Sequence, residues 1–223
     1  MIIKNIIFDV YGTLISTGTG SVDATRKIFE KYNLDEDEKD IYKKWKSIHK
    51  KNVREIKNFI SEKQIFTKDL EELFDIYGIK DNPKIEIKPM IDSMYDRKLF
   101  EETESAVDKL SEKYSIAIGS TTDTEPLLQN IKNTSLSKIQ DIYTSENLGY
   151  YKPDQNFYKE ILNRTNWKPE ECVFVGDSLD DDIIGPINAG MSAILIDRKD
   201  RYDRWPEGVD KIHSLMEIDN VLN

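Results

Sequence analysis

Polar side chains follow four short apolar runs of the chain, and their types are suited to hydrolytic chemistry. Asp9 comes directly after the first run, Ser120 closes the second, Lys152 follows the third and Asp177 follows the fourth. A carboxylate can act as a nucleophile or as a metal ligand, and a lysine supplies a compact positive charge. Each residue alone is weak evidence, because acids at strand ends are often turn residues. The four in this order indicate one shared site.

These residues need a fold that brings the ends of several strands together. Five apolar, β-type runs read as strands, at residues 2–8, 115–118, 141–144, 172–175 and 193–196. Stretches long enough for helices lie at about 103–113, 124–133, 154–165 and 180–189. This alternation is typical of βαβ crossovers, and continuous apolar runs indicate strands covered on both faces. We predict an α/β fold with a doubly wound parallel sheet and a site beyond the carboxyl ends of its strands.

Residues 17–88 break the alternation and read as helices. Apolar residues recur there at roughly helical spacing: Ile41, Trp45, Ile48, Ile56 and Ile60. We predict a core domain of residues 1–16 and 89–223 and a small helical cap domain of residues 17–88, placed over the carboxyl edge of the sheet. Basic residues are frequent in the cap, namely Lys43, Lys44, Lys46, Lys50, Lys51, Arg54 and Lys57. They form either a solvated helix face, which we favour, or a lid that attracts anionic substrates.

Composition and charge narrow the class of protein. The 223 residues carry a formal net charge of −10, which argues against binding to nucleic acid or to an anionic membrane. The sequence has no apolar stretch of membrane-spanning length and no signal peptide, so we expect a cytoplasmic protein. The single cysteine, Cys172, lies in an apolar run and reads as a core residue. With only His49 and His213, we do not expect a histidine-based metal site.

At its strand ends the chain resembles the haloacid dehalogenase superfamily of hydrolases. The resemblance rests on Asp9 to Leu14, Gly119 to Thr121, Tyr151 to Asp154 and Val175 to Asp182, and it continues to Arg198. It covers the whole sheet domain, and the helical insertion stands where that superfamily carries a cap, with only a loose sequence match. The resemblance implies a Rossmann-like core and hydrolysis of a small, anionic substrate.

The resemblance also implies a role for each motif residue. Asp9 would be the nucleophile and form a covalent intermediate that water then cleaves. Thr13 would orient Asp9, and Ser120 with Thr121 would hold the oxygens of the transferred group. Lys152 would keep Asp9 ionised and neutralise charge on the substrate.

A magnesium site is implied at the same place. Asp9, Asp177 and Asp182 would converge, and their mutual repulsion would raise their pKa values without a cation between them. Oxygen ligands favour a hard cation such as Mg²⁺, which Asp9, Asp177 and the backbone carbonyl of Tyr11 would bind directly, with Asp182 close by or acting through water. We expect Asp180 and Asp181 to be solvated residues of a first helical turn.

Tyr11 departs from the superfamily's phosphatases. They carry a second aspartate two residues after the nucleophile, which protonates the leaving group and then activates water. A phenol can donate a proton but is a poor base at neutral pH, so the chain would be a slow phosphatase unless another group substitutes. Asp123 is one candidate, although we expect it to cap the next helix.

Two other readings stay open. Tyrosine after Asp9-Val10 resembles the 2-haloacid dehalogenases of the superfamily, and Tyr158 matches a residue of their site, although we expect it to pack the core. Those enzymes work without metal, have no acid at the position of Asp177 and use a cap arginine where this chain has Lys46. The third reading is a catalytically weakened homologue that binds a ligand or a protein partner. We favour a Mg²⁺-dependent phosphatase of a small phosphorylated metabolite, and predict neither its substrate nor its oligomeric state.

Overall fold

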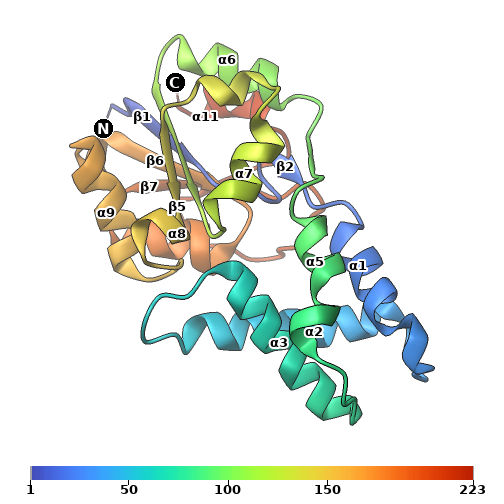
Figure 1. Cartoon of the computed structure of the whole chain (residues 1–223). Coiled ribbons are helices and arrows are strands. Elements are labelled where there is room, and N and C mark those ends of the chain that lie inside the picture. The colour runs from blue at the N-terminus through green and yellow to red at the C-terminus, as the bar shows by residue number, and fades with distance from the viewer. Residues whose placement is uncertain (1, 223) are drawn as a thin grey trace.

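A six-stranded parallel sheet flanked by helices forms the larger part of the molecule in the computed structural model, which describes residues 2–222 (Figure 1). Its strands are β1 (Asn5–Phe8), β4 (Ser115–Ser120), β5 (Asp141–Thr144), β6 (Cys172–Gly176), β7 (Ser192–Ile196) and β8 (Asp210–Ile212). Their order is β5-β4-β1-β6-β7-β8, and every neighbouring pair is parallel. The predicted doubly wound α/β fold is confirmed.

Alternate residues of the central strands enter two separate cores, as expected when helices cover both faces. Ile6 and Phe8 belong to a core that includes residues of α6 (Thr103–Ser111), α7 (Thr124–Ile131) and α11 (Ile218–Leu222). Ile7 belongs to the opposite core, with residues of α8 (Ser145–Leu148) and α9 (Gln155–Thr165). Cys172 is buried in this second core, as its apolar neighbours indicate.

Several local predictions need correction. Ile2 is exposed, and the first strand begins only at Asn5. Strand β8 and the short antiparallel pair β2 (Ile15–Ser16) and β3 (Lys98–Leu99) were not predicted, because they contain few residues.

The expected helix at 180–189 is a π-helical turn, η4 (Leu179–Ile184), followed by α10 (Gly185–Asn188). Pro186 has no N–H to donate, so an unbroken α-helical ladder cannot run through it. Short 3₁₀ turns are η1 (Glu30–Tyr32), η2 (Ser135–Lys138), η3 (Pro169–Glu171) and η5 (Leu215–Glu217).

Five helices between β2 and β3 form a group that we call the helical unit. They are α1 (Gly20–Phe29), α2 (Glu38–Arg54), α3 (Glu62–Tyr77), α4 (Pro83–Glu86) and α5 (Lys88–Ser93). Figure 1 shows α1, α2, α3 and α5 gathered at one end of the molecule, away from both chain ends. They enclose a hydrophobic cluster of their own that includes Ile41, Trp45 and Met90. None of the helices among residues 2–222 is long and apolar enough to span a membrane.

Local sequence explains where the longer helices of this unit begin and end. Asp37 caps α2 by accepting from the N–H groups of Lys39 and Asp40, and Ser61 forms a capping box with Gln64 at α3. Helix α2 ends at Arg54, so Ile56 and Ile60 do not continue its apolar stripe as the spacing predicted. Helix α5 spans the predicted boundary at residues 88 and 89 and packs against α1.

Candidate active site

The sheet has a topological switch point between β1 and β6. The chain leaves β1 for β4 on one side, and leaves β6 for β7 on the other, so a crevice opens at the carboxyl ends of these two central strands. Asp9 and Asp177 are the first residues after the two strands. The backbone N–H of Asp9 donates to the carbonyl of Val175 at 2.9 Å, which fixes the start of the β1 loop beside the end of β6.

Lys152 lies between two carboxylates of this crevice. Its Nζ is 2.7 Å from Asp9 Oδ1 and 2.7 Å from Asp182 Oδ1, and the residue is only 3% exposed. Burial alone would lower the pKa of this ammonium, but the charges of Asp182 and Asp9 outweigh burial and raise it. Lys152 is therefore a fixed positive charge in contact with the Asp9 carboxylate. The ion pairs found for Lys152 among residues 2–222 are with Asp9 and Asp182, and Asp177 pairs with Arg201 instead.

Asp9, Asp177 and Asp182 form a cluster in which carboxylate oxygens of all three lie within 4.8 Å of one another. Burial, with repulsion from Asp9, raises the pKa of Asp177 to about 6, against an opposing effect of Arg201. Burial and the same crowding raise the pKa of Asp182 well above its ordinary value. The cations in contact are Lys152 and Arg201, whose Nη2 is 2.9 Å from Asp177 Oδ2. Three acids against two cations leave a surplus of negative charge.

This donor set fits a hard divalent cation. All three side chains offer oxygen atoms, and the surplus charge is the one that a cation would balance. The Asp182 carboxylate is held in place by the backbone N–H of Ser178, which donates to Oδ2 at 2.9 Å, and by Lys152. The residues predicted from sequence to bind metal with their side chains are therefore brought together.

One hydroxyl group contacts the Asp9 carboxylate, and two more lie at the end of β4. Thr13 Oγ1 donates to Asp9 Oδ2 at 3.1 Å. The side-chain hydroxyls of Ser120 and Thr121 are buried, and neither has a hydrogen-bond partner among the described residues. Buried polar atoms are normally satisfied, so two unpaired hydroxyls at the end of β4 point to a ligand that accepts or donates there.

Two glycines allow the acids to come this close. A Cβ at Gly12 would lie 2.4 Å from Asp177 Oδ2, and φ at this residue is +101°, which side chains rarely adopt. A Cβ at Gly176 would lie 2.3 Å from Cγ of Asp182. The loops after β1 and β6 therefore meet without an intervening side chain.

The side chain of Tyr11 contacts α7 and the segment that leads into β3. Its hydroxyl accepts a 3.2 Å hydrogen bond from Asn130 Nδ2, and the Arg97 guanidinium lies 4.6 Å from the ring centroid. Burial, with the charge of Glu62, raises the pKa of Tyr11 to about 12. The phenol is therefore protonated at any physiological pH and cannot act as a base.

Comparison with known proteins decides the family. The sequence profile described as haloacid dehalogenase-like hydrolase matches residues 6–196, which is most of the chain. The chain belongs to this family. The resemblance seen at the strand ends is thereby confirmed, and the chain is a haloacid dehalogenase-like hydrolase.

Relatives of known name match only parts of the chain. A glyceraldehyde 3-phosphate phosphatase of Methanothermobacter thermautotrophicus is 32% identical over 90 residues, which are 38% of this chain and 40% of that protein. The glyceraldehyde 3-phosphate phosphatase of Methanopyrus kandleri is 38% identical over 74 residues, which are 33% of this chain and 32% of that protein. The chain therefore matches well under two thirds of the length of either relative.

Solved structures match the whole chain at low identity and show its fold. YfnB of Bacillus subtilis, described as a HAD-hydrolase bound to magnesium, has a TM-score of 0.79 and 22% identity, with all of both chains covered. L-2-haloacid dehalogenase of Xanthobacter autotrophicus has a TM-score of 0.81 and 15% identity, over 99% of this chain and 98% of that one.

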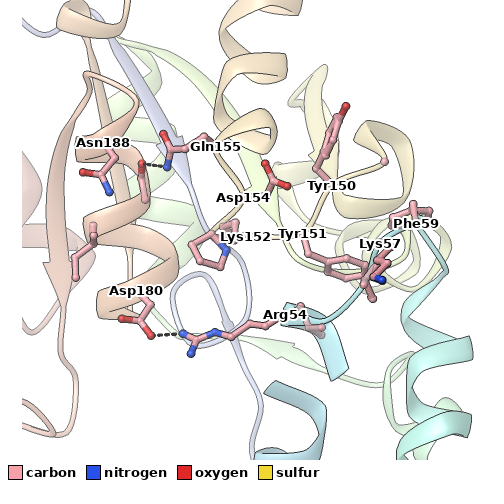
Figure 2. A pocket seen from close by; sticks show the side chains of 16 residues that line it. Arg54, Lys57, Phe59, Tyr150, Tyr151, Lys152, Asp154, Gln155, Asp180 and Asn188 are labelled. Atoms are coloured by element: carbon pink, nitrogen blue, oxygen red, sulfur yellow. Dashed lines mark hydrogen bonds and ion pairs between the residues drawn. The ribbon is translucent and has the colours of Figure 1, made fainter. Parts of the chain in front are cut away.

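Two cavities of this haloacid dehalogenase-like hydrolase share four lining residues, namely Val53, Arg54, Lys152 and Pro153. The larger, of about 670 Å³, lies between the segment after α2 and the loop that leads into α9. Figure 2 shows Arg54, Lys57 and Phe59 on one side of it and Asp154 and Gln155 on the other. The second cavity, of about 380 Å³, includes more of the site and is lined by residues of both the core and the helical unit: Thr17, Ser21, Tyr42, Trp45, Lys46, His49, Lys50, Val53, Arg54, Glu62, Phe66, Met90, Arg97, Thr121, Lys152, Pro153, Ser178 and Asp181.

The acids outside the cluster differ from expectation: Asp181 is half-buried and lines the smaller cavity, and Asp180 and Asp123 contact the helical unit. Asp180 is not simply solvated, because its Oδ2 forms ion pairs with Lys50 and Arg54 of α2 (the Arg54 pair is dashed in Figure 2). Asp123 does not cap α7 with its side chain. Its carboxylate instead accepts from the N–H groups of Glu62 and Lys63 at the start of α3. The reason is tertiary, because α3 approaches the end of β4 and offers its unpaired first-turn N–H groups.

The sequence did not predict a place in the site for several residues that lie near the smaller cavity. Glu62 accepts from Thr122 Oγ1 at 2.8 Å, and His49 and Arg97 line the smaller cavity. Lys46, Lys50 and Arg54 also line the smaller cavity. Part of the basic stretch of the predicted cap therefore borders this cavity, whereas we favoured a solvated helix face. Tyr158 is fully buried and packs against Phe157 and Phe174, as expected.

Proposed function

We propose that this protein is a Mg²⁺-dependent phosphatase of a small phosphorylated metabolite, with Asp9 as its nucleophile. The observation that carries the proposal is the crowding of Asp9, Asp177 and Asp182 within 4.8 Å, with pKa values raised at Asp177 and Asp182. Such a cluster costs free energy unless a cation compensates it, and a divalent cation would also neutralise a phosphate group. A site for uncharged carbon–halogen bonds gains nothing from this arrangement.

Each residue of the site has a task in this proposal. Asp9 attacks phosphorus, the bond to the leaving oxygen breaks, and an aspartyl phosphate forms that water later hydrolyses. Thr13 holds one oxygen of the nucleophile. The unpaired hydroxyls of Ser120 and Thr121 donate to the oxygens of the transferred phosphoryl group. Lys152 contacts the Asp9 carboxylate and offsets phosphate charge.

Mg²⁺ would be held by Asp9 and Asp177, with Asp182 near it and the Tyr11 backbone carbonyl as a further ligand. When bound, it would supply charge stabilisation for the phosphoryl group. The helical unit, which corresponds to the cap of residues 17–88 that the sequence predicts, would shape the leaving-group pocket and exclude water. The smaller cavity supports this, because residues of the unit and of the core line it together.

The names of the relatives agree with a small phosphate ester as substrate. The glyceraldehyde 3-phosphate phosphatases hydrolyse such a compound by their name, although they match this chain over at most 40% of their length. The substrate class is therefore proposed only as a small phosphorylated metabolite.

A 2-haloacid dehalogenase is the second candidate, and Tyr11 favours it. A halide leaves without a proton, so a chain with tyrosine in place of the acid could still perform that reaction. The third candidate is a catalytically weakened homologue that binds a ligand or a protein partner. The presence of all four motif residues argues against it: Asp9, Ser120, Lys152 and Asp177.

One set of assays separates the three. Purified protein is tested for phosphate release from a panel of small phosphate esters, with Mg²⁺ and with EDTA, and for halide release from 2-chloropropionate. We expect phosphate release that EDTA and Asp9→Asn both abolish. Halide release that survives EDTA would establish the dehalogenase instead, and no turnover of either class would favour the weakened homologue.

A further inference from the structure

His49, on α2 of the helical unit, is held by a buried acid. Its Nδ1 lies 2.7 Å from Oδ2 of Asp69 on α3, and Asn52 Nδ2 donates to Oδ1 of the same carboxylate at 2.8 Å. Asp69 is fully buried. A carboxylate of this kind only accepts hydrogen bonds, so Nδ1 of His49 carries a proton and Nε2 is the nitrogen available to a ligand.

The imidazole is fixed in orientation and borders the smaller cavity. The ring of Phe66 stacks on it, with centroids 4.9 Å apart and an interplanar angle of 29°. His49 lines the cavity together with Thr121, Lys152 and Ser178, whereas Asp69 does not. The cavity borders the site through Lys152, which contacts Asp9, and through Thr121, which follows Ser120. The leaving group of a phosphate ester bound at Asp9 would therefore extend into this cavity.

The surroundings of His49 favour its protonated form. Burial lowers its pKa, but the hydrogen bond and charge of Asp69, with the charge of Glu62, outweigh burial and place the pKa above its ordinary value. The other charged groups that line the same cavity are Lys46, Lys50 and Arg54 of its own helix, with Arg97, Lys152 and Asp181 of other segments. An imidazole whose protonated form is favoured can donate a proton and take one back.

The motif residues of the core offer no such group. The Tyr11 hydroxyl is engaged by Asn130 Nδ2 of α7, and the Arg97 guanidinium lies 4.6 Å from the centroid of its ring. Both oxygens of Asp123 are occupied by N–H groups of α3. A leaving alkoxide nevertheless needs a proton, and the water that follows has to lose one.

We propose that His49 is the acid and base of the phosphatase reaction, with Asp69 as its positioning residue. The inference rests on the phosphatase function proposed above. As Asp9 Oδ bonds to phosphorus, the P–O bond to the leaving group breaks and its electron pair stays on that oxygen, which takes the proton from Nε2. The neutral imidazole then takes a proton from the attacking water as the bond between Asp9 and phosphorus breaks, and phosphate leaves.

Two substrates with unlike leaving groups test the first proton transfer. Glycerol 3-phosphate releases an alkoxide that needs the proton, whereas p-nitrophenyl phosphate releases a stable phenolate that does not. The ratio kcat/KM reports the first irreversible step, which is formation of the aspartyl phosphate. In His49→Gln we expect kcat/KM for glycerol 3-phosphate to fall about 10²-fold or more, and for p-nitrophenyl phosphate to fall less than about tenfold.

The other histidine and Asp69 supply the controls. His213 is exposed and does not line the cavity, so His213→Gln should leave both values unchanged. Asp69→Asn removes the charge that raises the pKa of His49, so the fall of kcat/KM at high pH should move to lower pH. A variant that folds normally, as judged by its circular dichroism and Tm, and loses activity equally on both substrates would assign His49 to substrate binding and overturn the inference.

Failure of the two proposals can be told apart. If wild-type protein releases phosphate and His49→Gln does so equally well from glycerol 3-phosphate, the role of His49 is wrong and the phosphatase function stands. If wild-type protein releases no phosphate from any ester, the phosphatase function is wrong and the inference falls with it.

Discussion

The backbone N–H of Glu62 donates a 2.7 Å hydrogen bond to Oδ1 of Asp123. The N–H of Lys63 donates to the other oxygen at 3.1 Å, so an acid that follows β4 caps the first turn of α3. The negative charge pairs two N–H groups that the helix itself cannot satisfy and lies at the positive end of the helix dipole. This contact joins the helical unit to the loop that carries Ser120 and Thr121.

Removal of this cap should lower the free energy of unfolding by the amount that a helix cap usually contributes. For Asp123→Ala we expect the free energy of unfolding to fall by about 1 kcal/mol, and by less in Asp123→Asn, because an amide oxygen also accepts. Urea denaturation followed by circular dichroism measures both. Equal losses in the two variants would show that the charge, and not the acceptor, is what stabilises α3.

Replacement of Tyr11 by phenylalanine should leave the pH dependence of activity unchanged. The phenol, with a pKa of about 12, does not titrate in the working range, and its hydroxyl contacts Asn130 of α7. The variant should lose about 1 kcal/mol of stability, the usual contribution of one hydrogen bond. A pH–rate profile of Tyr11→Phe that loses a limb present in wild type would contradict this placement of the phenol outside proton transfer.

The pair of His49 and Asp69 predicts how stability depends on pH. The pKa of His49 is higher in the folded protein than in the unfolded chain, so the folded state binds its proton more tightly. The stabilisation is complete below the unfolded pKa, near 6.5, and is lost as the pH rises through the folded value. We expect Tm measured from pH 5.5 to 8.5 to fall more steeply in wild type than in His49→Gln. Parallel curves would show that the pair does not titrate with folding.

Magnesium should stabilise the protein through the acid cluster. A ligand present at 100 times its Kd adds about 2.7 kcal/mol to the free energy of unfolding. We expect this Mg²⁺-dependent rise in Tm in wild type and its loss in Asp177→Asn. The matched control is Asp200→Asn, because Asp200 is exposed, lies outside the acid cluster and keeps a positive φ that asparagine tolerates. A rise that survives in Asp177→Asn would place the ion elsewhere.

The core of the site could be predicted because parallel strands bring their carboxyl ends to one edge. A polar residue that follows an apolar run is therefore placed to within a few ångströms by the sheet alone, as for Asp9, Ser120 and Asp177. Lys152 follows its strand β5 by a longer interval, yet it reaches Asp9 because the short helix α8 returns the chain to the same edge.

Residues of the helical unit could not be placed in this way. His49 and Asp69 meet only because α2 packs against α3, and an apolar stripe predicts that two helices pair but not their register. Arg201 lies in the loop after β7, where no periodic pattern exists. Strand β8 was missed because its three residues, Asp210 to Ile212, include two charged side chains.

Gly12 constrains the variation that this enzyme can tolerate. The space that a methyl group would fill at this position is already taken by the Asp177 carboxylate. Residues 12 and 177 therefore cannot change independently: as long as an acid stands at 177, even alanine at 12 pushes it out of the cluster. In a library of all single substitutions that is selected for activity, variants at Gly12 should be lost as completely for small side chains as for large ones. At an ordinary turn, by contrast, alanine is often accepted.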